Sequence, residues 1–316
     1  MLTYRKQLKK HFIDVLGLAE LEKNTYTGFY TTVTNFSSDL MGFDNLQAGA
    51  LRPWEGTGSY YEEPHLASFL GRVNYTYDDR YVLTVNARTD ASSKFGANHK
   101  WGFFPSVSAA WNVSSEQFMK QITWIDNLKL RLGYGLAGNQ GGIDSYTTMN
   151  LVRPNGVAPV GNSPVVTYET LRNINPDLKW EVKHTFNAGF DVGFYGNRLL
   201  LSVNYYNSKT TDMLYNYRVS VPPFTYNTLL ANIGSMRNSG TEISVGITPL
   251  KTKDMELNIN ANITFQKNKL LSLNGMYNGE YISASEYTVI AGLDGAGFHG
   301  GYNNIVYPVS YTHLRA

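Results

Sequence analysis

A glycine pattern near the middle of the chain has the spacing of a nucleotide-binding loop. Residues 133–138 read Gly-Tyr-Gly-Leu-Ala-Gly and fit G-x-G-x-x-G. A dinucleotide site also needs a helix directly after the glycines, because the helix N-terminus holds the pyrophosphate. Residues 139–142, Asn-Gln-Gly-Gly, indicate a loop instead. We therefore expect no nucleotide cofactor at this position.

The other reactive side chains give little support for metal binding or for acid–base catalysis. The six histidines form no i, i+4 pair and no H-E-x-x-H motif, and the chain has no cysteine. The paired carboxylates Glu62-Glu63 and Asp78-Asp79 are adjacent, so in a strand they point to opposite faces. With 27 basic and 25 acidic residues there is no basic excess for nucleic acid. The sequence predicts no enzyme, no metal, no cofactor and no nucleic-acid partner.

Two groups of side chains remain that are suited to binding. Four basic residues fall on the polar face of alternating segments and are candidates to line an aqueous interior: Arg72, Arg88, Lys129 and Arg131. Seven aromatic residues lie between such segments and are candidates to stack on a ligand, above all on sugar rings: Trp54, Tyr60, Tyr61, Tyr146, Tyr168, Phe224 and Tyr226. The alternative for the basic group is ion pairing or plain solvation, and for the aromatic group packing within the loops.

The elements that position these residues are defined by a period of two. In 255–266 the positions Met255, Leu257, Ile259, Ala261, Ile263 and Phe265 are apolar and every residue between them is polar. Such alternation predicts a strand with one apolar face. The pattern recurs and predicts nine strands: 10–21, 66–77, 80–90, 101–113, 127–137, 181–195, 198–208, 238–249 and 255–267.

The lengths of these strands and of their connections favour a membrane barrel. A strand that crosses a bilayer needs about 9–11 residues, whereas about 5–6 is usual in a soluble domain. Short turns alternate with long connections, which are 22–65, 91–100, 138–180 and 209–237 and would be extracellular. The segment 114–126 interrupts the short series and is compatible with one short helix. Aromatic residues crowd the strand ends, as in the girdles of outer-membrane barrels.

Four segments also resemble the SusC/RagA-like family of TonB-linked outer-membrane proteins of Bacteroidetes. They are FGANHKWGFFPSVSAAWNVSSEQF (95–118), IDNLKLRLGYGLAGNQGG (125–142), NINPDLKWEVKHTFNAGFDVGFYGNRLLLSVNYYNSKTTDML (173–214) and NIGSMRNSGTEISVGITPL (232–250). The resemblance implies a barrel of about 22 strands closed by a plug domain. It implies a nutrient importer for oligosaccharides or peptides, with a SusD-like surface lipoprotein as a lid and the TonB–ExbB–ExbD complex as the source of energy.

The resemblance also implies that this chain is a fragment. We expect an all-β fold in which residues 1–308 form nine or ten strands of a large transmembrane antiparallel barrel in the outer membrane, without the plug. The last residues, VSYTHLRA (309–316), break the pattern and are expected to be a non-native or truncated tail. The basic residues of the polar face would then line the lumen or pair with acidic plug residues.

Three other functions stay open at this point. The chain could belong to a TonB-dependent receptor for siderophores or cobalamin instead of glycans. It could be a soluble β-sandwich that acts as a binding module, since sandwich strands also alternate. An outer-membrane enzyme would need a catalytic constellation at the outer rim, and none is evident in the sequence.

Overall fold

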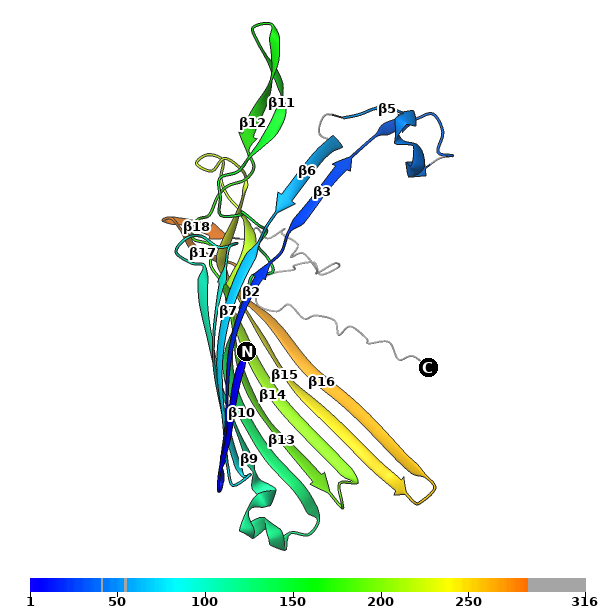
Figure 1. The fold of residues 1–316 in the computed structure, drawn as a ribbon, viewed down its shortest axis with the longest axis vertical. Coiled ribbons are helices and arrows are strands. Elements are labelled where there is room, and N and C mark those ends of the chain that lie inside the picture. The colour runs from blue at the N-terminus through cyan, green and yellow to red at the C-terminus, as the bar shows by residue number, and fades with distance from the viewer. Residues whose placement is uncertain (41, 54–55, 284–316) are drawn as a thin grey trace.

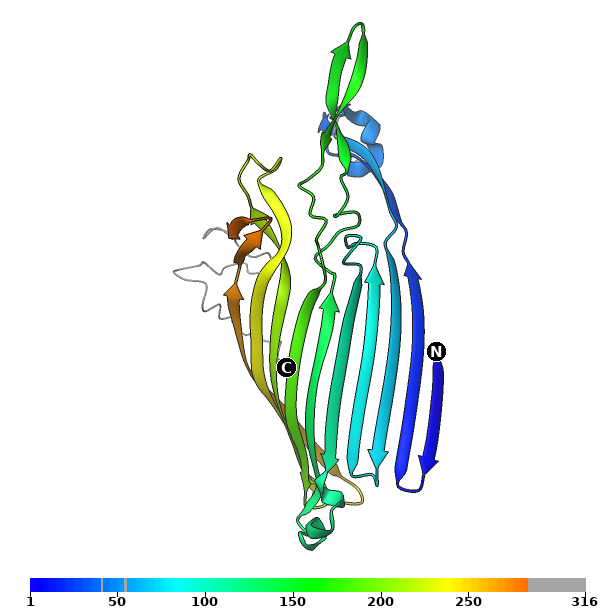
Figure 2. The same cartoon turned by 90° about the vertical axis from the view of Figure 1, so that its left-hand side faces the viewer.

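The computed structural model describes residues 1–40, 42–53 and 56–283, and its main element is one antiparallel sheet of ten strands. The strands follow one another in chain order, so each pairs with its predecessor through a simple connection. Figures 1 and 2 show the sheet as a single curved wall. Its strands are β1 (Leu2–Leu8), β2 (His11–Lys23), β7 (His65–Tyr77), β8 (Tyr81–Ser92), β9 (Trp101–Asn112), β10 (Ile125–Asn139), β13 (Glu181–Phe194), β14 (Leu199–Arg218), β15 (Thr228–Lys251) and β16 (Glu256–Ser272).

The connections at one rim of the wall are short. Asp78, Asp79 and Arg80 join β7 to β8, and Asp78 and Asp79 have positive φ values of 52° and 54°, a backbone that Asp tolerates in tight turns. Lys10 and Arg80 both form ion pairs with Asp78, at 3.1 and 3.0 Å. The connection after β9 is the longest at this rim and contains two 3-10 segments, η3 (Val113–Ser115) and η4 (Gln117–Gln121).

The connections at the other rim are long and carry small hairpins of their own. Figure 1 shows two of them projecting far beyond the wall. The strand pairs in these connections are β3 (Tyr26–Thr31) with β6 (Thr57–Glu62), β4 (Thr34–Phe36) with β5 (Gly49–Leu51), β11 (Val152–Val160) with β12 (Ser163–Thr170), and β17 (Asn274–Tyr277) with β18 (Glu280–Ser283). A 3-10 segment, η1 (Gly42–Ala48), lies between β4 and β5.

One face of the wall, here called the outward face, carries apolar rows. Residues directly opposite in antiparallel strands share a face, and four such rows cross β13 to β16. The rows are Phe194–Leu199–Ile247–Ile259, Val192–Leu201–Val245–Ala261, Phe190–Val203–Ile243–Ile263 and Ala188–Tyr205–Thr241–Phe265. On β13 the apolar positions run from Phe194 to Phe186, about 26 Å along the strand. That length suits the apolar band of an outer-membrane barrel, about 25 Å tall.

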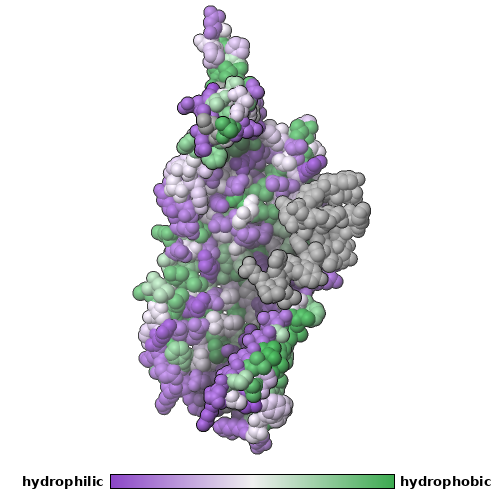
Figure 3. Space-filling model, turned by 90° about the vertical axis from the view of Figure 1, so that its right-hand side faces the viewer, coloured by the Kyte–Doolittle hydropathy of each residue, from purple (hydrophilic) through white to green (hydrophobic). Residues whose placement is uncertain are grey.

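The other face, here called the concave face, carries polar and small residues. One row across five strands is Asn86–Ser106–Gly135–Thr185–Ser208. Figure 3 views the wall from its open side, and along the edge formed by the β15–β16 hairpin a purple polar row runs beside a green apolar row. The strict alternation therefore separates a face for lipid from a face for water.

Aromatic side chains stack on the outward face beside the short turns. The ring of Tyr81 lies 6.4 Å from that of Tyr77 and 6.3 Å from that of Trp111. Farther along the same rim, Trp124 stacks on Phe194 at 5.7 Å. The expected girdle is therefore present at this rim as contacting pairs, whose amphipathic rings suit a membrane–water interface.

The nine strands expected from the alternation are all present, and the structure adds to them. β1 pairs with β2 and makes the tenth strand. The expected loop 209–237 is largely strand, because β14 continues to Arg218 and β15 begins at Thr228. The expected short helix at 114–126 is replaced by η3 and η4, which are separated by Glu116 in an extended conformation.

Candidate functional site

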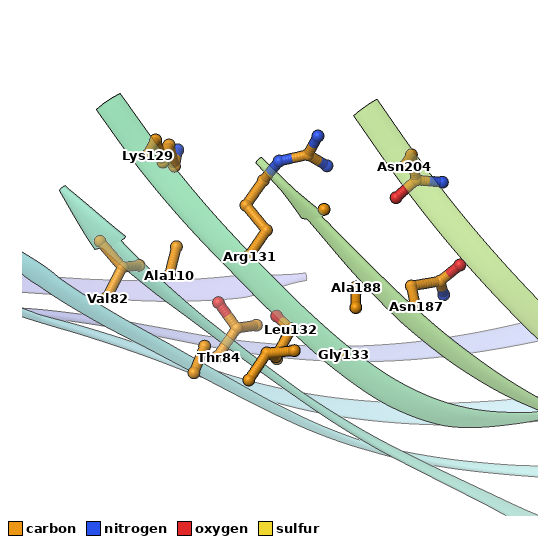
Figure 4. A pocket seen from close by; sticks show the side chains of 13 residues that line it. Val82, Thr84, Ala110, Lys129, Arg131, Leu132, Gly133, Asn187, Ala188 and Asn204 are labelled. Atoms are coloured by element: carbon orange, nitrogen blue, oxygen red, sulfur yellow. The ribbon is translucent and has the colours of Figure 1, made fainter. Parts of the chain in front are cut away.

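A hollow of about 420 Å³ lies on the concave face, over β8 to β14 (Figure 4). It exists because Gly133 and Gly189 place no side chain there. Gly189 faces Arg131 across the ladder, and a Cβ at Gly189 would lie 3.2 Å from Nη2 of Arg131. The missing Cβ lets the guanidinium of Arg131 lie over Gly189 and reach Asp191 on the same strand, β13.

Arg131 and Asp191 form a two-pronged ion pair at the edge of this hollow. Nε and Nη2 of Arg131 donate to Asp191 at 2.8 and 2.9 Å, and the Ser202 hydroxyl donates to the same carboxylate at 2.6 Å. Lys129 lines the hollow as well, and its side chain has no ion pair or hydrogen bond with any residue in the described ranges. In the register Lys129 lies opposite Asp191, so both basic groups of the hollow face the same carboxylate, Arg131 through hydrogen bonds and Lys129 through charge alone.

We expect Arg131→Ala to lower the free energy of unfolding by about 1 kcal/mol, because it strands the Asp191 carboxylate and the pair is partly exposed to solvent. Lys129→Ala should cost less than Arg131→Ala, since Lys129 attracts Asp191 across the ladder but makes no hydrogen bond to it. Thermal unfolding of the two variants checks this. Equal losses would contradict the assigned ion pair.

The other two basic candidates, Arg72 and Arg88, lie on the concave face nearer the long connections. Nε of Arg88 donates to both oxygens of Asp90, at 3.0 and 2.8 Å. Nε of Arg72 donates to Asn86 at 2.7 Å, and Asn86 donates to Ser106 at 2.9 Å. A second hollow of about 550 Å³ lies beside them. All four basic candidates thus share one face but border two separate hollows.

The aromatic candidates do not form one surface. Tyr60 and Tyr61 belong to β6, and Tyr168 belongs to β12 on a separate hairpin. Phe224 and Tyr226 lie in the turn between β14 and β15, where the Tyr226 hydroxyl donates to the backbone oxygen of Thr170. Trp54 lies outside the described residues. Within the described set, only Tyr61 and Tyr146 are joined, through Glu63.

Glu63 fastens the arm formed by residues 24–62 to the wall. Its carboxylate accepts from the Tyr61 hydroxyl at 2.5 Å, from Lys23 Nζ at 2.9 Å and from the His65 ring at 2.9 Å. Its backbone N–H donates to the Tyr146 hydroxyl at 3.0 Å. The hydrogen bonds from Tyr61, Lys23 and His65 lower the pKa of Glu63 to about 2. This cluster, which the sequence did not reveal, joins three segments that are distant along the chain.

Acid should release the arm only at low pH. A carboxylate with a lowered pKa stabilises the fold above its ordinary pKa of 4.5, and this contribution disappears as the pH falls from there through about 2. Amide hydrogen exchange of residues 26–62 should therefore be constant from pH 7 to 5 after correction for intrinsic rates, and should quicken below. Glu63→Gln should quicken exchange at pH 7, whereas the neighbouring Glu62→Gln should not. A matching response in both variants would refute the role of Glu63.

A small apolar core, also not foreseen from the sequence, holds the long connections together at the rim. It consists of Phe95, Phe104, Ile143, Leu178 and Trp180, all buried. The Trp180 ring lies 4.7 Å from Phe95 and 5.5 Å from Phe104, and its Nε1 donates to Lys100 O at 3.0 Å. Connections 93–100 and 140–180 are therefore built onto the wall.

Asparagine side chains fasten the end of the second connection to β15. Nδ2 of Asn175 donates to Leu230 O at 2.9 Å. Asn232 donates to Lys179 O at 2.8 Å and accepts from Lys179 N at 3.0 Å. Because these amides mimic a strand partner, residues 173–179 follow the edge of the extended hairpin. Asparagine-rich sequence was the only signal, and it equally suits exposed loops.

Two kinds of feature are absent from the described residues, a metal-binding cluster and a membrane-spanning helix. Within these ranges, no three His, Asp or Glu side chains lie close enough together to hold a metal ion. No helix in the same ranges is long and apolar enough to cross a membrane.

Comparison with known proteins shows to which family the ten-stranded sheet belongs. Residues 4–313 match the family described as TonB dependent receptor-like, beta-barrel. The chain is 34% identical over 284 residues to TonB-dependent receptor P26 of Formosa agariphila, covering 87% of this chain and 28% of the relative. It is 34% identical over 247 residues to TonB-dependent receptor SusC of Bacteroides thetaiotaomicron, covering 72% of this chain and 24% of SusC. The chain thus spans about a quarter of the length of these relatives.

A solved structure shows the same arrangement of strands. The RagAB peptide importer in its open-open state superposes with a TM-score of 0.74 at 26% identity, covering 87% of this chain and 30% of that chain. The chain therefore belongs to the TonB-dependent receptor family, and its ten-stranded sheet is part of the outer-membrane β-barrel of that family.

Proposed function

We propose that this chain forms part of the barrel wall of a TonB-driven importer for oligosaccharides. The observation that carries the proposal is the chemistry of the concave face, where neutral hydrogen-bonding groups outnumber charges. Thr84, Ser108, Asn187 and Asn204 line the central hollow together with Lys129 and Arg131. Such groups suit the hydroxyls of a neutral sugar, which needs many donors and acceptors and no charge partner. The four basic residues of this face would then line the lumen.

A SusD-like surface lipoprotein would cap the importer at the rim with the long connections, and the TonB–ExbB–ExbD complex would drive it from the periplasm. The likeness to SusC supports this pairing. The extended β14–β15 hairpin and the two projecting hairpins offer the cap a structured surface (Figure 1). The loop aromatics would stack on sugar rings or pack against the cap.

A second candidate cargo is a peptide. The solved neighbours are described as a peptide importer and a peptide transporter, at 25% to 26% identity. The Arg–Asp pairs of the concave face would suit the charged groups of a peptide better than those of a neutral sugar.

Uptake assays with the full-length receptor separate these cargoes. A strain that lacks the gene should lose import of labelled neutral oligosaccharides, and wild-type receptor should restore it only when TonB is present. Asn204→Leu, in the central hollow, should reduce import, whereas Val203→Leu, next to it on the outward face, should not. Loss of peptide import alone would favour the second cargo. Loss of siderophore or cobalamin import alone would overturn the proposal.

A further inference from the structure

Basic side chains lie side by side on the outward face of β14, β15 and β16. The register pairs Lys209 with Arg237 and Arg237 with Lys269, and His184 of β13 continues the row. One step nearer the apolar rows, Lys267 lies beside Ser239. Adjacent strands are about 4.8 Å apart, so three permanent positive charges fall within about 10 Å. This set, Lys209, Arg237, Lys267 and Lys269, is called the basic row below.

The basic row has no counter-charge in the described part of the chain. None of its four side chains forms an ion pair or side-chain hydrogen bond there. The six outward rows that cross β13 to β16 between His184 and Phe194 contain no Asp or Glu. Like charges directly opposite one another in a sheet destabilise it. An anion from outside the wall is therefore the expected partner.

The position of the basic row limits what that anion can be. The cations lie beyond the apolar outward positions, at the end nearer the long connections: Lys267 directly follows Phe265 on β16, whereas neutral polar residues separate Lys209 from Tyr205 on β14 and Arg237 from Ile243 on β15. A ligand there has its charge at the membrane surface and its neighbouring part against the apolar rows. The cations are confined to β14, β15 and β16. Toward the same rim, β7 and β9 carry the stacked aromatic rings of Phe69 and Trp101 instead.

We propose that the basic row binds the phosphate groups of a phosphorylated lipid of the outer leaflet, whose acyl chains lie on the apolar rows of β13 to β16. Lysine ammonium groups and the fork of Arg237 are the donors that phosphate prefers. Asn207 and Ser239 lie in the row below and supply neutral hydrogen bonds to the headgroup. The wall thus carries a lipid site on the opposite face from its aqueous hollows.

Binding of a defined lipid to the full-length receptor in neutral detergent tests the proposal. The probes are bis-phosphorylated lipid A, the same lipid without phosphates, and inorganic phosphate, each counted by native mass spectrometry. Wild type should bind the phosphorylated lipid, and the triple variant Lys209→Gln, Arg237→Gln, Lys269→Gln should bind it about a hundredfold more weakly, since each basic residue near an anionic surface contributes about fivefold. Lys183→Gln is the control, because Lys183 is next to His184 in the sequence but lies on the concave face. This variant should bind the lipid like wild type.

Thermal unfolding gives a second readout that a merely structural role would not produce. Without lipid the triple variant should melt above wild type, because repulsion in the row is relieved. With phosphorylated lipid the order should reverse, because only wild type is stabilised by the ligand. Arg237→Gln alone carries the test if the triple variant fails to assemble. Equal lipid binding by variant and wild type, or displacement of the lipid by millimolar inorganic phosphate, would overturn the proposal.

Discussion

Trp180→Ala should lower the free energy of unfolding of the rim that carries the long connections by about 3–5 kcal/mol, the usual cost of truncating a buried Trp. Trp180 is 7% exposed and contacts both Phe95 and Phe104. The substitution opens a cavity in a core of only five buried residues, and it removes one of the two donors to Lys100 O, the other being the Ser92 N–H at 3.1 Å. Hydrogen exchange in residues 93–100 and 171–180 should rise steeply, while exchange in the membrane part of β13 should stay slow.

Trp180→Phe separates the two contributions. It keeps most of the ring but not the hydrogen bond to Lys100, so about 1–2 kcal/mol should be lost. Trp124→Ala provides an exposed control, because Trp124 is half exposed on the short-turn rim. If Trp180→Ala left exchange in both connections at the wild-type rate, the connections would be held by something other than this core.

Ile243→Arg should destabilise the barrel by about 2–4 kcal/mol in a bilayer, because the residue lies near the middle of the apolar band. Its row, with Phe190, Val203 and Ile263, is the third of the four apolar rows. A guanidinium there cannot reach either interface without distorting its surroundings. Equilibrium unfolding of the receptor in phosphatidylcholine vesicles measures the free energy.

Neighbouring positions supply the matched controls. Ser244→Arg, on the concave face between Ser202 and Asn262, should cost well under about 1 kcal/mol. Ile259→Arg should also cost less than Ile243→Arg, because its row lies beside the short turns. An identical cost at Ile243 and Ser244 would mean that the two faces are wrongly assigned.

The strands inside the membrane were predictable from the sequence because lipid and water impose opposite demands on alternate residues. Each of the nine alternating segments is a strand, and the faces of 255–266 are as the pattern indicates. β1 was missed because Arg5 and Lys6 place charges on both of its faces, so period two is not visible over seven residues.

The outer parts of β14 and β15 could not be recognised in the same way. Beyond Lys209, residues 210–218, TTDMLYNYR, show no strict alternation. These strands persist because they pair with each other and because both faces find partners, as where Tyr217 packs on Leu229 and Ile282. Such partners come from distant segments, which single-sequence periodicity does not reveal.

The candidate binding residues were only partly predictable. Alternation places Arg72, Arg88, Lys129 and Arg131 on one face, and the structure has them there. That Arg131 reaches Asp191 depends on Gly189 in the neighbouring strand, which periodicity cannot indicate. The clusters around Glu63 and Trp180 join connections whose mutual positions follow from tertiary packing. The ligand-binding role of the loop aromatics stays a prediction.

The extension of β14 and β15 past the membrane also has a mechanical meaning. Residues 210–218 of β14 and 228–236 of β15 continue the two strands beyond Lys209 and Arg237 as a paired ribbon, so a force on its outer end is transmitted toward the wall and is not absorbed in a flexible loop. The ladder is interrupted between Thr210 and Met213, where Asp212 has a positive φ of 53°. A second register shift follows directly, between Met213 and Leu214, so the two irregularities together form the compliant part of the described ribbon, just beyond Lys209. Any load from a cap would therefore bend the ribbon at these irregularities and leave the wall below undisturbed.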